Sequence, residues 1–150
     1  MRTVSLYDVL VGYFAQDPVD PTSIDRSYFD KFSEHEKIRH SIIENLTKIL
    51  QTRQGSVQHL PDFGLPDIME EYMNAGYTFD PLRKTIRETI IKYEPRLAKV
   101  RVEEPKFDRD NFRIFFKIVA TIQDFPETEI LLTEFSTTGW TKVTFERDAR

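Results

Sequence analysis

The hydrophobic pattern of this chain changes its period at Pro95. Before Pro95, apolar residues recur every three or four positions, which is typical of amphipathic helices. After it, apolar and polar residues alternate, which is typical of strands with one buried face. Helices followed by strands indicate the α+β class. We therefore expect N-terminal helices packed on one face of a three- to four-stranded antiparallel C-terminal sheet.

The best helix signal begins at Ser33, which forms a capping-box pattern with Glu36. One apolar stripe then continues to Gln51, where we expect the helix to stop. The segment 52–66 contains two glycines and two prolines and is expected to be a loop. The residues of the stripe are Ile38, Ile42, Leu46, Ile49 and Leu50.

Two further helices are expected before Pro95. Asp67 suits the N-cap of a short helix over residues 67–73. Asp80 suits the N-cap of a second one, with Pro81 at its first helical position. Pro95 stops this helix, because the residue before a proline avoids helical geometry. Its apolar face contains Leu82, Ile86, Ile90 and Tyr93.

Four segments after Pro95 carry the alternation expected of strands. The first contains Val100 and Val102, and residues 128–135 and 141–147 form the last two. We expect turns at residues 108–111 and near residues 138–139. The clearest strand places six apolar residues on one face: Phe112, Ile114, Phe116, Ile118, Ala120 and Ile122.

The N-terminal segment is expected to stand apart from the main domain. Residues 5–14 resemble a short helix, and the next segment contains Pro18 and Pro21. We expect a docking helix at residues 1–15, a linker at 16–30 and a single domain at 31–150. The residues expected to dock on a partner are Leu6, Tyr7, Val9, Leu10 and Tyr13.

Composition excludes several classes of protein. The 150 residues are 39% hydrophobic and 31% charged, which suits one soluble domain. The net charge of −4 argues against nucleic acid as the main partner. There is no cysteine, so disulfides and thiolate metal sites are excluded. Neither a membrane span nor a secretory signal is recognisable, so we expect a cytoplasmic protein.

Motifs for metal binding or catalysis are missing. His35 and His40 are five positions apart, about 140° around a helix, so they cannot share a ligand. His59 and Asp62 give two candidate ligands on a loop, too few for a metal site. The sequence contains no Gly-x-Ser-x-Gly motif and no phosphate-binding glycine loop. We expect no metal, no cofactor and no enzymatic activity.

A succession of motifs over residues 41–102 resembles a known family. The order is Thr52-Arg53-Gln54-Gly55, then Pro61-Asp62-Phe63-Gly64-Leu65-Pro66-Asp67, then Tyr93-Glu94-Pro95-Arg96-Leu97 before Val100-Arg101-Val102. These motifs resemble the small baseplate wedge proteins of contractile tails, often labelled lysozyme-like, and most of all the TssE branch of type VI secretion. Phe63 stands where the family usually has tyrosine. Residues 5–10 also resemble the short leading motif of the family, but they lack the basic residue expected near Val9.

The resemblance implies a structural role without catalysis. Such proteins lie at the top of the baseplate wedge, at the inner face of the cell envelope, and start the first sheath ring by exchanging strands with sheath subunits. In physical terms, an exposed sheet edge accepts a partner strand. The partners implied are larger wedge proteins (TssF- and TssG-like) and sheath subunits. An obligate homo-oligomer is not implied.

The candidate residues for partner binding also have purely structural interpretations, and the resemblance favours the binding role for Glu94, Pro95 and Arg96. The candidates are Glu94, Pro95, Arg96, Arg53, Gly55, Asp62, Phe63 and Gly64. Pro95 could simply stop a helix, Gly55 could provide a positive φ, and Arg53 could interact with helix-end carbonyls. For Arg96 we expect a guanidinium that is exposed in the free protein and bound only when a sheath subunit docks.

Two alternatives remain at this stage. A lysozyme-like hydrolase would need two positioned carboxylates, one of them kept protonated. The obvious acid, Glu94, has Lys92 and Arg96 close in sequence, and cations favour its ionised form. An unrelated small adaptor would share the fold class but not the motif order.

Overall fold

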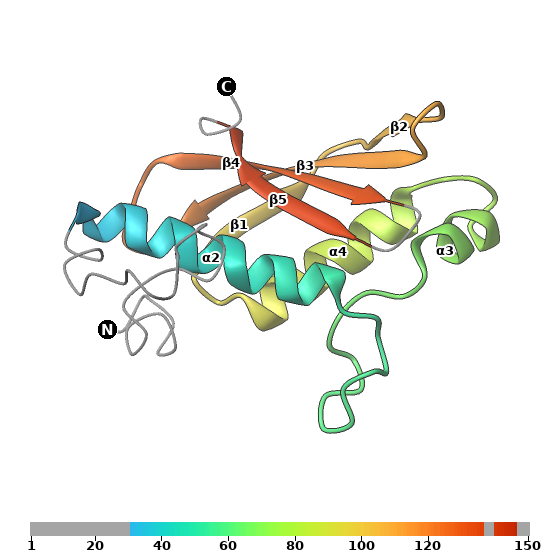
Figure 1. Cartoon of the computed structure of the whole chain (residues 1–150), viewed down its shortest axis with the longest axis horizontal. Helices are drawn as coiled ribbons and strands as arrows, with labels where there is room; N and C mark the ends of the chain where they lie inside the picture. Colours follow the sequence, from blue (N-terminus) through green and yellow to red (C-terminus); the bar gives the residue numbers. More distant parts are fainter. Residues whose placement is uncertain (1–30, 137–139, 147–150) are drawn as a thin grey trace, which may run out of the picture. The chain divides into compact units, whose positions relative to one another are not determined.

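The computed structural model describes residues 31–136 and 140–146, so the expected docking helix and linker lie outside the described residues. The chain divides into two compact units, Met1–Asn45 and Leu46–Arg150. In the described part of the chain, three helices precede five strands (Figure 1), which confirms the α+β class.

Helix α2 (Glu34–Gln51) begins and ends where the sequence predicts. The backbone N–H of Ser33 donates to Glu36 Oε2 at 2.7 Å, and the N–H of Glu36 donates to Ser33 Oγ at 3.2 Å. This is the predicted capping box. The hydrogen bonds from Ser33 lower the pKa of the Glu36 carboxyl. All five residues of the predicted stripe are buried.

Helices α3 (Ile68–Asn74) and α4 (Asp80–Tyr93) also match the prediction, except at one cap. Asp67 caps α3, its side chain accepting an N–H from the first turn. The prediction that Asp80 caps α4 is wrong. Phe79 is the N-cap residue and makes no side-chain capping bond. Asp80 lies inside the helix, where its carboxylate accepts from an arginine one turn later.

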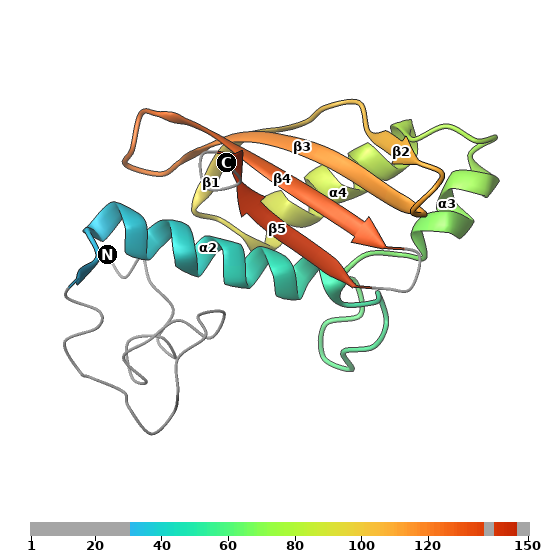
Figure 2. The ribbon, with the colours of Figure 1, turned by 45° about the horizontal axis from the view of Figure 1, so that its top comes forward.

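The sheet contains five strands, one more than the upper end of the predicted three to four. The antiparallel order is β1-β3-β4-β5, and the short β2 pairs with β3 beside the start of that strand (Figure 2). The prediction missed β2 because three residues are too few to display an alternating pattern. The strands are β1 (Leu97–Val102), β2 (Lys106–Asp108), β3 (Arg113–Ile122), β4 (Thr128–Ser136) and β5 (Thr141–Phe145).

Phe112 is not part of the buried strand face. It has φ +51° in the turn before β3, and its side chain is 61% exposed. Asp108 causes this difference, because its carboxylate accepts the backbone N–H groups of Asp110 and Asn111 and holds a tight turn. The expected alternation begins only two residues later, at buried Ile114.

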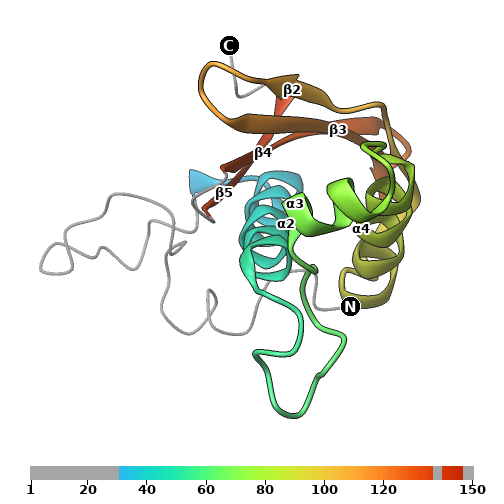
Figure 3. The same ribbon diagram turned by 90° about the vertical axis from the view of Figure 1, so that its right-hand side faces the viewer.

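One face of the sheet forms the core of the larger unit, and we call it the inner face. It is made of alternate residues of β3 together with buried residues of β1, β4 and β5. Helix α4 packs against β1, and Figure 3 shows α3 and α4 on the same side of the sheet. A chain of aromatic contacts links α3 to this face: Tyr72 stacks on Phe79, Phe79 meets Phe116 edge-on, and Phe116 meets Phe135.

Candidate functional site

The junction between α4 and β1 contains a buried ion pair. Arg96 Nε and Nη2 donate to Glu94 Oε1 and Oε2, both at 2.7 Å, and the Arg96 backbone N–H donates to Oε1 at 3.2 Å. The Glu94 side chain is completely buried, and the Arg96 side chain is 21% exposed. Pro95, which separates them, is exposed.

This geometry contradicts the expectation that Arg96 is exposed until a partner docks. A buried carboxylate is costly unless a cation neutralises it, and the forked guanidinium matches both of its oxygens. Because the chain is extended after α4, the side chains of Glu94 and Arg96 point to the same side. Arg96 can therefore fold back and neutralise the buried carboxylate of Glu94. The junction is therefore braced internally. A partner-binding role for these three residues remains a prediction.

A second cluster connects the loop at residues 52–66 to the end of α4. The carboxylate of Asp62 accepts from Lys92 Nζ through one oxygen and from the Tyr93 hydroxyl, at 2.7 Å, through the other. Phe63 packs edge-on against the Tyr93 ring, with 4.9 Å between centroids. The hydrogen bond from Lys92, then that from Tyr93, lowers the pKa of Asp62 to about 2. The sequence motif around Asp62 thus lies beside the helix that leads into Glu94.

The base of this loop is closed by its own backbone. Gly64 has φ +96°, and a Cβ there would lie 2.2 Å from the carbonyl oxygen of Thr52. The N–H of Leu65 donates to that same oxygen at 3.0 Å. The backbone of Arg53 forms an isolated parallel β-bridge with that of Leu65. The guanidinium of Arg53 lies 3.8 Å from the Asp67 carboxylate. Gly64 is therefore required by close packing, whereas Gly55, at φ +88°, meets nothing within 4 Å.

The two outer strands of the sheet differ in how their edges are covered. On β1, Arg83 Nε and Nη2 donate to the Val102 carbonyl at 3.1 and 2.9 Å, and Arg87 Nε donates to the Val100 carbonyl at 2.9 Å. These carbonyls point away from β3. Two arginines of α4 therefore occupy acceptors that an added strand would need.

Strand β5 has β4 as its only neighbour among the described strands. The Ser136 N–H donates to the Trp140 carbonyl at 3.0 Å. Because backbone groups alternate in direction along an antiparallel strand, Lys142 and Thr144 also face β4. The backbone groups of Thr141 and Val143 therefore point to the outer edge. The sequence pattern did not predict that the two edges differ. Arg83 and Arg87 are one turn apart on α4 and lie outside its apolar face, and this spacing was a usable signal that they could cover a neighbouring strand.

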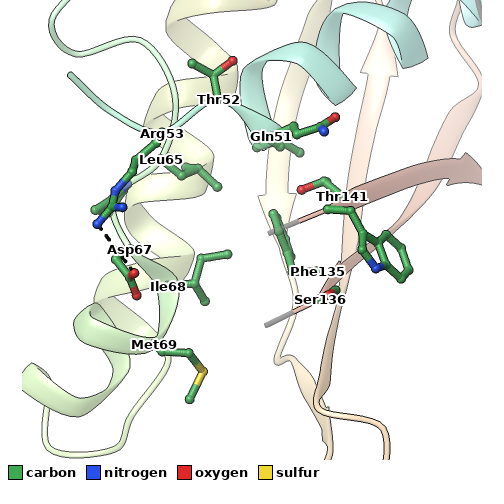
Figure 4. Close-up of a pocket in the computed structure, with 13 residues that line it drawn as sticks. Gln51, Thr52, Arg53, Leu65, Asp67, Ile68, Met69, Phe135, Ser136 and Thr141 are labelled. Atoms are coloured by element: carbon green, nitrogen blue, oxygen red, sulfur yellow. Dashed lines mark ion pairs between the residues drawn. The ribbon is translucent and has the colours of Figure 1, made fainter. Parts of the chain in front are cut away.

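A pocket with a volume of about 330 Å³ lies beside the start of β5 (Figure 4), and we call it the β5 pocket. Leu65, Ile68 and Met69 contribute apolar side chains from one side, and Phe135 and Thr141 line the other. The Arg53–Asp67 pair lies on its lining. Its remaining lining residues are Leu50, Gln51, Thr52, Pro66, Ser136 and Trp140.

The face of the sheet opposite the core, the outer face, carries a mixed charge pattern. Arg113 pairs with Glu134 at 2.7 Å and lies over the Trp140 ring, 5.2 Å from its centroid. Lys117 pairs with Glu146 at 3.3 Å. A groove of about 570 Å³ follows this face. Four glutamates and three lysines line this groove, so it carries charges of both signs.

The described residues provide no arrangement suited to glycoside hydrolysis at Glu94. Its carboxylate is fully buried, and a guanidinium engages both oxygens, so no substrate oxygen can reach it. Within residues 31–136 and 140–146, no three His, Cys, Asp or Glu side chains are grouped to hold a metal ion. No helix of the same residues is long and apolar enough to cross a membrane.

Comparison with known proteins identifies related structures. The sequence model of a family described as baseplate wedge protein gp25 matches residues 36–127. A chain in a structure of the baseplate complex from the type VI secretion system is 28% identical, with a TM-score of 0.54 over 75% of this chain and 96% of that chain. A protein from Geobacter sulfurreducens described as a tail lysozyme shares the fold, at 23% identity and a TM-score of 0.52, over 70% of this chain and 93% of that one. No curated protein matches the chain.

Proposed function

Since this chain belongs to the family of baseplate wedge protein gp25, we propose that it is a non-catalytic structural subunit of a type VI secretion baseplate. It links the wedge to the first sheath ring and starts sheath assembly by strand exchange. The similarity to a chain of the type VI baseplate complex supports the choice of machine. The other wedge components, TssF- and TssG-like proteins, are its proposed neighbours, at the cytoplasmic side of the envelope.

The observation that carries the strand-exchange proposal is the difference between the two sheet edges. The carbonyls of Val100 and Val102 on β1 already accept from Arg87 and Arg83. On β5, the outward groups of Thr141 and Val143 belong to a strand with one described neighbour. The edge of β5 is therefore the one that receives the sheath strand, since an added strand needs backbone donors and acceptors in a row.

A hydrolase is not supported by the geometry of the obvious acid. Glu94 is an internal brace, and the resemblance to a tail lysozyme concerns the fold alone. We therefore assign the proposed role to surfaces and not to a catalytic centre. Residues 1–15, with Leu6, Tyr7, Val9, Leu10 and Tyr13, remain the proposed contact with the larger wedge proteins.

The edge can be tested with proline. Thr141→Pro removes a donor that faces the outer edge and keeps the ladder to β4, so the free protein should melt close to wild type. In cells with a fluorescent sheath subunit, this variant should assemble few or no sheaths. Thr144→Pro removes a donor that faces β4, and it should lower the melting temperature.

The control opens the other edge. Arg83→Gln with Arg87→Gln weakens the cover on β1 and should leave the number of sheaths unchanged. If Thr141→Pro is stable and sheaths still form at the normal frequency, β5 does not receive the sheath strand. If only the arginine variant stops assembly, α4 and β1 form the relevant surface.

A further inference from the structure

The β5 pocket lies where a strand added to β5 would place one of its side chains. Thr141 is the first residue of β5 and lines the pocket. Its side chain points to the same face as those of Val143 and Phe145, which are buried in the core. A partner residue directly opposite Thr141 would share that face, with its Cβ about 4.5–5.5 Å away. Its side chain would therefore extend toward the pocket.

The lining of the pocket determines which side chain suits it. Leu65, Ile68, Met69 and Phe135 offer apolar contacts. A volume of about 330 Å³ lies at the small end of ligand pockets, roughly 300–1,000 Å³. Arg53, whose side chain is 74% exposed, lies in the lining with its guanidinium at 3.8 Å from Asp67. At that distance it keeps donors for a carboxylate or carbonyl of an incoming segment.

We propose that the β5 pocket binds one large apolar side chain of the sheath strand, at the position opposite Thr141. This inference rests on the proposed addition of a sheath strand at β5. Main-chain hydrogen bonds along the edge supply affinity for any extended segment, and pockets for alternate side chains supply specificity. A slip of one residue would turn the apolar side chain to the outer face. The pocket therefore fixes the register of the first strand exchange.

The chain provides an internal reporter for this event. Trp140 is its only tryptophan and belongs to the pocket lining. Full-length protein produced with 5-fluorotryptophan carries one fluorine label, and the purified sheath subunit, produced without the label, adds no fluorine signal. Titration of the sheath subunit should shift the single resonance and give a dissociation constant.

Two substitutions on α3 form a matched pair. Met69 lines the pocket, whereas Met73, one turn later, lies outside it and is 51% exposed. Met69→Tyr fills the pocket with a ring and should weaken binding of the sheath subunit by about tenfold or more, as expected when an anchor side chain loses its site. Met73→Tyr should bind like wild type. If Met69→Tyr lowers the melting temperature, Met69→Gln, which keeps the side-chain length and adds polarity, replaces it and should weaken binding as well.

Comparison with Thr141→Pro separates this inference from the function on which it rests. If Thr141→Pro abolishes binding and the Met69 variants bind like wild type, strand addition stands and the pocket has no role. If Thr141→Pro also binds normally, strand addition at β5 is refuted as well. Equal weakening by the Met69 and Met73 variants would assign the effect to the surface of α3 and would overturn the pocket.

Discussion

The replacement of Arg96 by alanine tests whether the α4–β1 junction is braced from within. It removes two hydrogen bonds of 2.7 Å from the guanidinium and leaves the 3.2 Å bond from its own backbone N–H. Glu94, which is completely buried, then loses the guanidinium that engages both of its carboxylate oxygens. Breaking a buried ion pair from one side costs about 3–5 kcal/mol. Because one N–H remains and Arg96 is 21% exposed, we expect the lower end, about 3 kcal/mol.

This loss is large enough to measure by thermal or urea unfolding followed by circular dichroism. A change of 1 kcal/mol shifts the melting temperature of a domain of this size by about 2–4 °C, so Arg96→Ala should lower it by about 6–12 °C. Arg96→Lys keeps the charge and loses the fork, so it should be intermediate. Replacing both residues together, Glu94→Leu with Arg96→Met, should recover most of the stability, since neither charge of this pair then remains.

The chain contains a matched control for this experiment. Arg101 pairs with Glu103 at the same sequence spacing, at 3.2 Å, but both side chains are exposed, at 69% and 41%. Arg101→Ala should therefore cost only about 0–1 kcal/mol. If Arg96→Ala unfolds within about 0.5 kcal/mol of Arg101→Ala, the pair does not brace the junction and the reasoning from burial is refuted.

Two further predictions concern the loop at residues 52–66. Asp62 has a pKa of about 2 in the folded protein against 3.8 ordinarily, so its stabilising effect is complete above about pH 4 and is lost as the pH falls toward 2. The difference in melting temperature between wild type and Asp62→Asn should therefore shrink over this range; a difference independent of pH would refute the role of the carboxylate. Gly64→Ala should destabilise far more than Gly55→Ala in urea unfolding. Both strain a positive φ, at about 1–2 kcal/mol, but only Gly64 also meets a backbone carbonyl. Equal losses of unfolding free energy in the two variants would show that the backbone around Thr52 moves to accommodate the added Cβ.

The sequence predicts the elements well because their signals are local. The capping box at Ser33 and the stop at Pro95 act within a few residues, and so they place α2 and the end of α4 correctly. The errors arise where a neighbouring group competes for a residue. Asp80 is a good cap by type, yet its carboxylate accepts from an arginine inside the helix. Phe112 fits the alternation, yet the turn held by Asp108 ends the pattern before it.

The sequence indicated which segments belong to the candidate site, but it did not indicate which residues contact one another there. Motif order selected the loop around Asp62 and the junction around Arg96. Their partners depend on tertiary burial, which a sequence pattern does not encode. Glu94 is fully buried and therefore takes Arg96 as its partner. Likewise, the cover on β1 requires knowing that α4 packs along that strand with Arg83 beside Val102.

The arginine cover on β1 also limits how copies of this chain can join to one another. A sheet with two open edges can add copies at both ends and grow into an open-ended fibre. Arg83 and Arg87 on the carbonyls of β1 oppose pairing between copies through β1, whereas pairing of β5 with β5 would close a two-fold dimer and stop. If β5 accepts a sheath strand as proposed, the cover on β1 favours pairing with that different partner over open-ended growth from copies of this chain.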